Sequence, residues 1–425
     1  MKPLPFVALL AALTFLYFWR TRKAAVAAVG SAALVVLLAL SMILLPEPSF
    51  RAAERGLILW WEVVLPALLP FFIAAELLMG MGIVHFMGVF MEPLMRPLFN
   101  VPGAGSFSFA MGLASGYPLG ASLSARLKES GLATKTEAER LMCFCNTSDP
   151  LFMTGAVAVG MLKRVDAGIF IIMGHYLSAL IVGISLRFWR RKSPPSPPID
   201  SGERGFIVTR AYRAMRNYQR KNPKPFGEIL GAAVNKSVMS LLMILGFIVL
   251  SSVVFEVLKS VGAIGVLSSV ISKVVPEKII PASLHEALVS GLFEITIGCS
   301  TASEAAAPLI SKVALVGAII AWSGLSVHAQ VAAVIHGARL SVWPYVASRG
   351  FQAVLAGILT YLFMARDRVR WALPAFEPHT ITGSLAWFEN LGSATGTCLG
   401  ILAVMGTIPL VFTLIHGAKS AIKRN

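Results

Sequence analysis

The sequence predicts an all-α polytopic membrane protein, and composition and hydropathy both support this fold class. Of the 425 residues, 56% are hydrophobic and only 14% are charged, whereas a soluble domain carries about a quarter charged residues. Several stretches reach the roughly 20 apolar residues that span a bilayer, most clearly residues 24–45, 229–258 and 342–365. We expect helices because an apolar bilayer core cannot solvate open backbone.

The first apolar run covers residues 4–19. No small-residue cleavage site precedes the basic residues 20–23, so we expect a retained helix rather than a removed signal peptide. A second helix over 24–45 leads outside, residues 47–55 lie there, and a third helix over 57–79 returns. Glu62 and Glu76 on this third helix stand 14 residues apart. They therefore fall on nearly one helical face, and we expect them near the membrane interfaces.

A basic loop sets the topology. Between Arg190 and Lys224, ten Lys or Arg residues stand against two acidic residues, a bias typical of a cytoplasmic loop. Three apolar stretches (104–127, 141–162 and 167–187) precede this loop, and an even number of crossings is needed to reach the cytoplasm. We therefore expect 104–127 to be a re-entrant hairpin with its tip within the membrane.

The two halves of the chain carry similar polar interruptions. Ser148 follows Gly120 by 28 residues, and Ser326 follows Gly298 by the same interval. This spacing predicts an inverted repeat with about nine transmembrane helices and two re-entrant hairpins. The last helix, 394–416, returns the basic tail to the cytoplasm, although Arg366, Arg368 and Arg370 then lie outside, against the charge bias. The expected segments are 1–55, 56–190, 191–227, 228–365 and 366–425.

The first interruption is the run Asn146, Thr147, Ser148, Asp149 and Pro150 at the centre of an apolar stretch. Proline removes a backbone donor and disfavours helical geometry in the residue before it, so the helix should unwind here. An ionised Asp149 at the bilayer centre costs about 3 kcal/mol or more unless it is paired or hydrated. A substrate or ion site is the favoured interpretation. A loop outside the membrane and a buried capping aspartate are the alternatives.

The second interruption covers residues 323–326, and the polar residues Ser326, His328 and Gln330 come at its end and after it. Residues two apart share a face only in extended or distorted chain, so these three favour a broken helix over a regular one. His328 is the only clear intramembrane cation that we expect, and a hydrogen-bonded core histidine is its alternative role. The second predicted hairpin places Glu294 and Thr296 in apolar sequence, where the carboxylate needs a partner.

The hairpins and breaks contain residues that permit tight turns or close approach of backbones. We expect these residues to act as hinges or re-entrant turns; they are Gly116, Pro118, Gly120, Pro150, Gly298 and Gly324.

The basic loop carries much of the net charge of +16. It opens with the proline-rich run 193–198, an extended linker. Residues 205–222 then read as a basic amphipathic helix on anionic lipid, and a solvated linker is the alternative. Because the charge is concentrated in this loop, we do not expect nucleic-acid binding. The apolar or aromatic anchors are Phe206, Ile207, Tyr212, Met215 and Tyr218.

Several classes of chemistry have no motif in this chain. The four cysteines, Cys143, Cys145, Cys299 and Cys398, lack zinc-ligand spacing and lie in apolar segments, so we expect buried thiols, no metal site and no disulfide framework. No phosphate-binding loop, zinc helix, nucleophile elbow or dinucleotide fingerprint is present. We therefore expect no catalytic residues, no enzyme activity and no cofactor, with H⁺ or Na⁺ coupling left open.

Several long strings resemble one known family. Residues 65–72, 92–103, 114–120 and 146–150, with 293–298 and 324–330 in the second half, closely resemble the sporulation integral membrane protein family (YlbJ-like). The resemblance covers roughly residues 55–365. It implies membership of the nucleoside-recognition Gate domain group, so that 56–190 and 228–365 would be two Gate repeats. It also implies a multi-pass protein of the sporulating cell, in the mother-cell or outer forespore membrane, needed for spore cortex formation.

These observations lead to one functional hypothesis. A transporter-like protein moves a small polar solute, nucleoside-like or cation-coupled, through a midplane site. A non-transporting scaffold that organises cortex-building proteins through the basic loop is the alternative from another class, and a homo-oligomer is left open. The expected binding residues are Asn146, Thr147, Ser148, Asp149, Glu294, Thr296, Ser326, His328 and Gln330.

Overall fold

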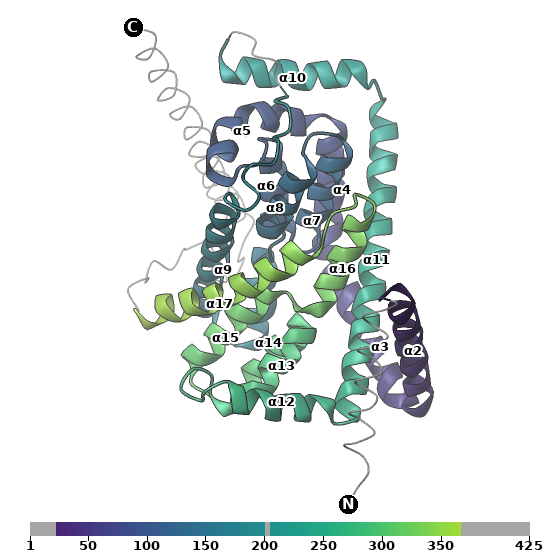
Figure 1. Cartoon of the computed structure of the whole chain (residues 1–425), viewed down its shortest axis with the longest axis vertical. Coiled ribbons are helices and arrows are strands. Elements are labelled where there is room, and N and C mark those ends of the chain that lie inside the picture. The colour runs from purple at the N-terminus through teal and green to yellow at the C-terminus, as the bar shows by residue number, and fades with distance from the viewer. Residues whose placement is uncertain (1–22, 200–204, 367–425) are drawn as a thin grey trace, which may run out of the picture.

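The structure is a computed structural model that describes residues 23–199 and 205–366. Within these ranges the chain forms helices and no strands (Figure 1), so the all-α fold class is confirmed. The helices predicted over 4–19 and 394–416 lie outside the described residues, as do Cys398, Arg368 and Arg370.

Four described helical segments are long and apolar enough to cross a membrane. They are α9 (Val165–Leu186), α11 (Phe226–Ser260), α17 (Trp343–Ala365) and the stretch Leu309–His336, which includes α15 and α16. The number rises to six if each of two sharply bent pairs counts as one span. The first pair bends by 107° after Leu44 and the second by 83° after Gly80. The total of about nine helices stays a prediction.

The N-terminal part contains α2 (Lys23–Leu44), α3 (Pro46–Leu59), η1 (Trp60–Val64) and α4 (Leu65–Gly80). Residues 47–55, expected to connect the second and third helices, are themselves helical and belong to α3, which begins at Pro46. Proline is favoured in the first helical turn, where its missing N–H has no partner to lose. α3 packs along α11, and an ion pair of 2.7 Å joins Arg55 to Glu256 across them.

The first half continues with a short helix, a hairpin, a broken helix and a long helix. These are α5 (Ile83–Phe99), α6 (Gly105–Ser115) with α7 (Leu119–Glu129), then α8 (Lys135–Cys145) with η2 (Phe152–Met161), and finally α9. α6 and α7 have 11 residues each and are therefore about 16 Å long. That is roughly half the hydrocarbon thickness, the length expected of a re-entrant hairpin.

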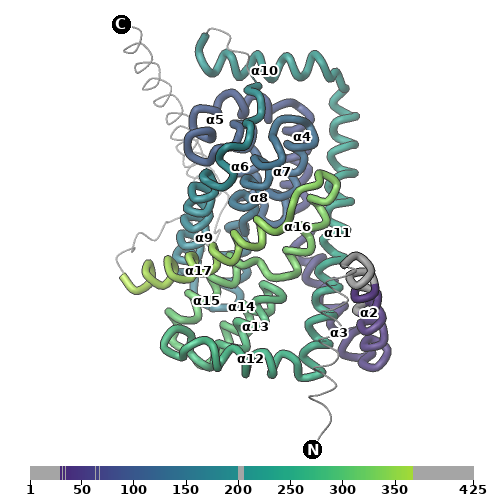
Figure 2. The backbone as a smooth tube through the Cα atoms, in the orientation of Figure 1, coloured from purple at the N-terminus to yellow at the C-terminus, as the bar shows by residue number. Residues whose placement is uncertain are grey.

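The second half repeats this order of elements. After α10 (Ile207–Lys221) and α11 come the short α12 (Ala263–Val274), η3 (Ala282–Leu284) and the helix pair α13 (His285–Phe293) and α14 (Ile295–Glu304). The interrupted pair α15 (Leu309–Trp322) and α16 (Gly324–His336) follows, and then α17. Figures 1 and 2 show α10 and α12 lying across opposite ends of α11.

The basic helix predicted over 205–222 is present as α10, but it packs on α5. Tyr218, expected to contact lipid, stacks on His85 with ring centroids 4.2 Å apart. Ile207 is buried, whereas Phe206 and Tyr212 remain exposed. Part of the predicted lipid-facing set thus contacts protein, and binding of anionic lipid by the rest stays a prediction.

The proline-rich run before α10 has no regular secondary structure, but it is not a free linker. Ser196 is only 4% exposed. Its backbone N–H donates to Glu137 on α8, and Arg96 on α5 donates to its carbonyl at 3.0 Å. Arg96 also pairs with Glu137 and with Glu92 one turn earlier. These bonds attach the run to the ends of two helices.

Candidate functional site

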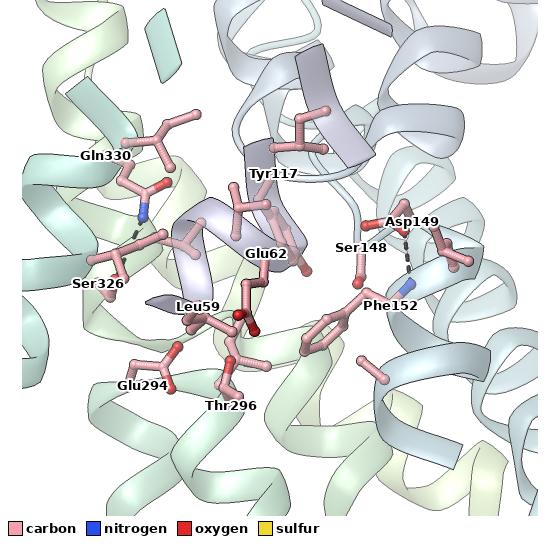
Figure 3. Close-up of a pocket in the computed structure, with 18 of the residues that line it drawn as sticks. Leu59, Glu62, Tyr117, Ser148, Asp149, Phe152, Glu294, Thr296, Ser326 and Gln330 are labelled. Carbon is pink, nitrogen blue, oxygen red and sulfur yellow. Dashed lines mark hydrogen bonds between the residues drawn. The ribbon is translucent and has the colours of Figure 1, made fainter. Parts of the chain in front are cut away.

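A cavity of about 610 Å³ lies where the interrupted segments meet. Its wall combines the break after α8, the junction between α13 and α14, one face of α16 and the turn η1 (Figure 3). Three carboxylates and several uncharged polar groups line it together with apolar side chains. Six residues predicted for the site are in this wall: Ser148, Asp149, Glu294, Thr296, Ser326 and Gln330.

The first break is stabilised by a helix cap and by α9. The backbone is non-helical from Asn146 to Asp149 and becomes helical again at Pro150, as the missing proline N–H predicts. The Asp149 carboxylate accepts the N–H of Phe152 at 2.8 Å and so caps the new helix. Ser148 donates its N–H to His175 at 3.1 Å and accepts at its carbonyl from the Tyr176 hydroxyl at 3.1 Å. Buried backbone therefore has partners despite the break.

Asn146 and Thr147 were predicted to bind solute, but they do not line the cavity. The Asn146 amide donates to the Tyr345 hydroxyl at 2.9 Å, and Thr147 donates to the carbonyl of Gly112 at 3.2 Å. Both residues are fully buried. Their side chains hold the unwound segment against neighbouring helices.

Arg349 is a buried cation that the sequence analysis, which expected His328 as the only clear intramembrane cation, did not predict. It is fully buried on α17. It donates to the carbonyl of Cys143 and, at 3.0 Å, to that of Asn146. These carbonyls lie at the C-terminal end of α8, where a positive charge is favoured by the helix dipole. Arg349 therefore terminates α8 from the other half of the chain.

The second break is more compact than the first. Ser323 and Gly324 both have positive φ, 71° and 67°, a conformation that costs glycine little. A regular helix resumes at Gly324, so the distorted helix predicted for residues 326–330 is wrong. Ser326 and Gln330 instead share a face by the i,i+4 relation, with the Gln330 amide 3.4 Å from the Ser326 hydroxyl.

His328 points to a different face of α16 and is not in the cavity wall. One ring nitrogen lies 2.7 Å from the carbonyl of Gly324. The ring packs between Trp322 and Tyr345, with centroid distances of 4.5 and 5.3 Å. This arrangement matches the alternative of a core histidine rather than the predicted binding role.

Glu294 occupies the junction between α13 and α14 and caps the second of these helices. Its carboxylate accepts the N–H of Ile297 at 2.7 Å. Asp149 and Glu294 are thus alike: each ends a non-helical segment, caps a helix N-terminus and faces the same cavity. The helix dipoles offset part of the cost of burying a negative charge at both positions.

The predicted hinge residues have two different roles. Gly116, with φ of 78°, ends α6, and a cis peptide bond joins Tyr117 to Pro118. Gly120 and Gly298, by contrast, lie inside helices and are not turns. A Cβ on Gly120 would overlap the carbonyl of Cys145, and one on Gly298 would overlap Gly291. Their role is close approach of backbones.

Glu62 is a cavity residue that sequence reasoning placed near a membrane interface. It lies in the π-helical turn η1 and lines the cavity. Glu76 is outside the cavity, forms a partly buried ion pair with Arg126 on α7, and lies 4.0 Å from Lys236. The π turn changes the angle about the helix axis between residues 62 and 76. The two side chains therefore do not lie on one face, as residues 14 apart would in a regular helix. Pro66, which has no N–H for the carbonyl of Glu62, is the local signal for such a turn.

Comparison with known proteins identifies the family. The Gate model, described as nucleoside recognition, matches residues 61–165. The sporulation integral membrane protein YlbJ of Bacillus subtilis (strain 168) is 41% identical over 338 residues, which cover 77% of this chain and 81% of that protein. The chain belongs to the YlbJ family. It is accordingly a multi-pass integral membrane protein of a sporulation family, and the resemblance noted in the sequence is confirmed.

Two solved structures of CNTnw variants are also similar to this YlbJ-family chain. A variant in an intermediate state has a TM-score of 0.44 at 15% identity. A variant in an outward-facing state has a TM-score of 0.41 at 12% identity. Each match covers 78% of this chain and 86% of the other.

Proposed function

We propose that this YlbJ-family protein is a transporter that moves a small polar solute across a membrane of the sporulating cell and thereby serves spore cortex formation. One observation supports this above all. Asp149 and Glu294, from different halves of the chain, cap two helix N-termini that face one cavity. Helix ends directed at a shared cavity are the usual construction of a solute site inside a membrane.

The order of elements supports an inverted repeat as the transport device. Each half has a long helix, a short helix, a hairpin, a broken helix and another long helix. Contacts between the halves are made at the breaks: Tyr117 donates to the carbonyl of Ile320 at 2.9 Å, and Arg349 donates to that of Asn146. Relative movement of the halves would expose the cavity to each side in turn.

The cavity wall restricts the chemistry of the solute. Its volume of about 610 Å³ lies within the range of small-molecule sites. The described residues that line it include Glu62, Asp149 and Glu294 and no Lys, Arg or His. A neutral polyhydroxylated or nucleoside-like solute, or one that enters with H⁺ or Na⁺, fits this wall. A bare anion would be repelled and would need accompanying protons or cations.

The test separates charge from helix capping. Asp149→Asn keeps an effective capping oxygen but removes the charge, and Glu294→Gln does the same with an isosteric side chain. Glu47→Gln is the matched control, because Glu47 is 73% exposed in a surface pair with Arg51. We expect both cavity variants to reach normal membrane levels yet form defective cortex, while the control forms normal cortex.

Metabolite profiles of vesicles with and without the protein would then identify the solute. Normal cortex in both cavity variants would overturn the proposal.

The scaffold alternative is favoured by the exposed position of α10 on α5, outside the cavity. Deletion of residues 199–222 tests it separately. Loss of cortex in that deletion, with normal cortex in both cavity variants, would establish the scaffold.

A further inference from the structure

One hydroxyl group connects the two helix breaks. Tyr345 lies on α17 and is fully buried. Its oxygen accepts from the Asn146 amide at 2.9 Å and lies 3.2 Å from the Ser323 hydroxyl. Asn146 follows α8 at the first break, and Ser323 separates α15 from α16 at the second. Two breaks in different halves of the chain therefore share one bonding partner.

These bonds form a directed chain. The Asn146 side-chain oxygen accepts the N–H of Ala121 at 3.3 Å, which orients the amide so that its NH₂ group meets Tyr345. Because the Tyr345 oxygen accepts from this group, its own hydrogen is available to Ser323. The distance of 3.2 Å is long for a bond between two hydroxyls, so the Ser323 bond is the weaker of the two.

The ring of Tyr345 adds packing contacts to both breaks. His328 on α16 packs on it with ring centroids 5.3 Å apart, and a His328 ring nitrogen lies 2.7 Å from the carbonyl of Gly324. The Arg349 guanidinium lies 5.4 Å from the Tyr345 ring centroid and donates to the carbonyl of Asn146 at 3.0 Å. Residues one turn apart on α17 thus hold the end of α8 and the start of α16.

This arrangement ties a change at one break to a change at the other. Movement of the first break away from Tyr345 leaves a buried amide without its acceptor, and such a group costs free energy. Chains of packed side chains and hydrogen bonds are the physical carriers of energetic coupling between sites. Both breaks adjoin the cavity, through Asp149 at the first and Ser326 at the second.

We propose that Tyr345 is a positioning residue that couples the two breaks, so that the polar segments on both sides of the cavity change conformation together. Its own side chain does not line the cavity, and it acts through Asn146 and Ser323. This inference rests on the proposed transport function and names the residue that synchronises the two halves.

Hydrogen–deuterium exchange of the full-length protein in lipid nanodiscs tests the coupling without knowledge of the solute. Peptide mass spectrometry follows residues 147–152 at the first break and 324–328 at the second. Tyr345→Phe removes only the hydroxyl and should speed exchange at both breaks by about fivefold, the effect of one hydrogen bond of ordinary strength. Ser323→Ala keeps the Cβ at this positive-φ position. It should speed exchange at the first break by about twofold or more, the lower end of coupling between contacting residues.

The double variant is decisive. In the Tyr345→Phe background, Ser323→Ala should cause no further change at the first break, because the hydroxyl that transmits its effect is absent. The matched controls are Tyr361→Phe, 47% exposed on the same helix, and Ser269→Ala, exposed on α12; both should leave the breaks unchanged. An unchanged first break in Ser323→Ala, an equal further effect in the double variant, or an effect of Tyr345→Phe at one break alone would overturn the coupling.

The outcome is independent of the cortex assay. Uncoupled breaks together with defective cortex in Asp149→Asn would reject only the role of Tyr345. Coupled breaks together with normal cortex in both cavity variants would reject transport and leave the coupling in place.

Discussion

Replacement of Glu137 by alanine should release the proline-rich run from α8 and destabilise the protein. Glu137 is 2% exposed and accepts N–H groups from Thr134 at 2.8 Å and from Ser196 at 3.1 Å, besides its ion pair with Arg96. Alanine leaves the buried N–H of Ser196 without its acceptor, at about 1–3 kcal/mol. It also leaves Arg96 with Glu92 as its remaining carboxylate. Because Arg96 keeps Glu92, its charge is not left uncompensated, so the cost of about 3–5 kcal/mol for removal of one member of a buried pair is the upper limit that we expect for the total loss.

Two assays measure this effect in purified protein. The thermal unfolding midpoint in detergent should fall by several degrees, and limited proteolysis should cut the 190–224 segment faster. Glu137→Gln is the matched control, because it keeps an oxygen for the N–H groups of Thr134 and Ser196. An unchanged midpoint together with unchanged proteolysis in the alanine variant would refute the role assigned to Glu137.

The surroundings of Glu137 also predict that the stability of the protein depends on pH. Burial alone would raise the pKa of Glu137, but the N–H groups of Thr134 and Ser196 and the Arg96 guanidinium together hold it below its usual range. A depressed pKa in the folded state means that this stabilisation is present above the unfolded pKa and is lost as pH falls through the folded pKa. The wild type should therefore lose stability in acid more steeply than Glu137→Gln.

Two further substitutions test the packing around the first break. Gly120→Ala places a Cβ against the carbonyl of Cys145 and should lower the unfolding midpoint and the membrane level. Gly246→Ala, in open space on α11, should leave both unchanged or slightly raised, and equal effects would contradict the close approach. Tyr345→Phe removes the hydroxyl that bonds Asn146 at 2.9 Å and should cost about 1–2 kcal/mol in the same unfolding assay. No loss would show that the hydroxyl does not hold the break.

The interruptions of the helices could be predicted from sequence because their causes are local. A proline without an N–H and an adjacent aspartate predict unwinding at 149–150, and a glycine in apolar sequence predicts the break at 324. The roles of the individual polar residues were less predictable. Asn146 and His328 have polar side chains of the kind that bind solutes. Contacts with Tyr345, which is distant in the sequence, turn both away from the cavity.

Arg349 and Glu62 were missed for a related reason. The partners of Arg349 are the backbone carbonyls of Asn146 and Cys143, which stand 203 and 206 residues earlier in the chain. These carbonyls become available only because α8 ends there. No side chain near Arg349 in the sequence indicates them. The orientation of Glu62 depends on one π turn, which changes the facing of every residue after it. A single irregular turn is enough to invalidate an amphipathic pattern drawn for a regular helix.

Capping and solute binding were set out as competing roles for Asp149, but the geometry allows both at once. A carboxylate has two oxygens with several acceptor sites, and the bond to Phe152 uses one oxygen. The residue also lines the cavity. The cap fixes the orientation of the carboxylate and stabilises its charge, both of which a binding site in an apolar medium requires. Capping and the proposed solute binding can therefore use the same carboxylate, and Asp149→Asn, which preserves the cap and removes the charge, separates their contributions.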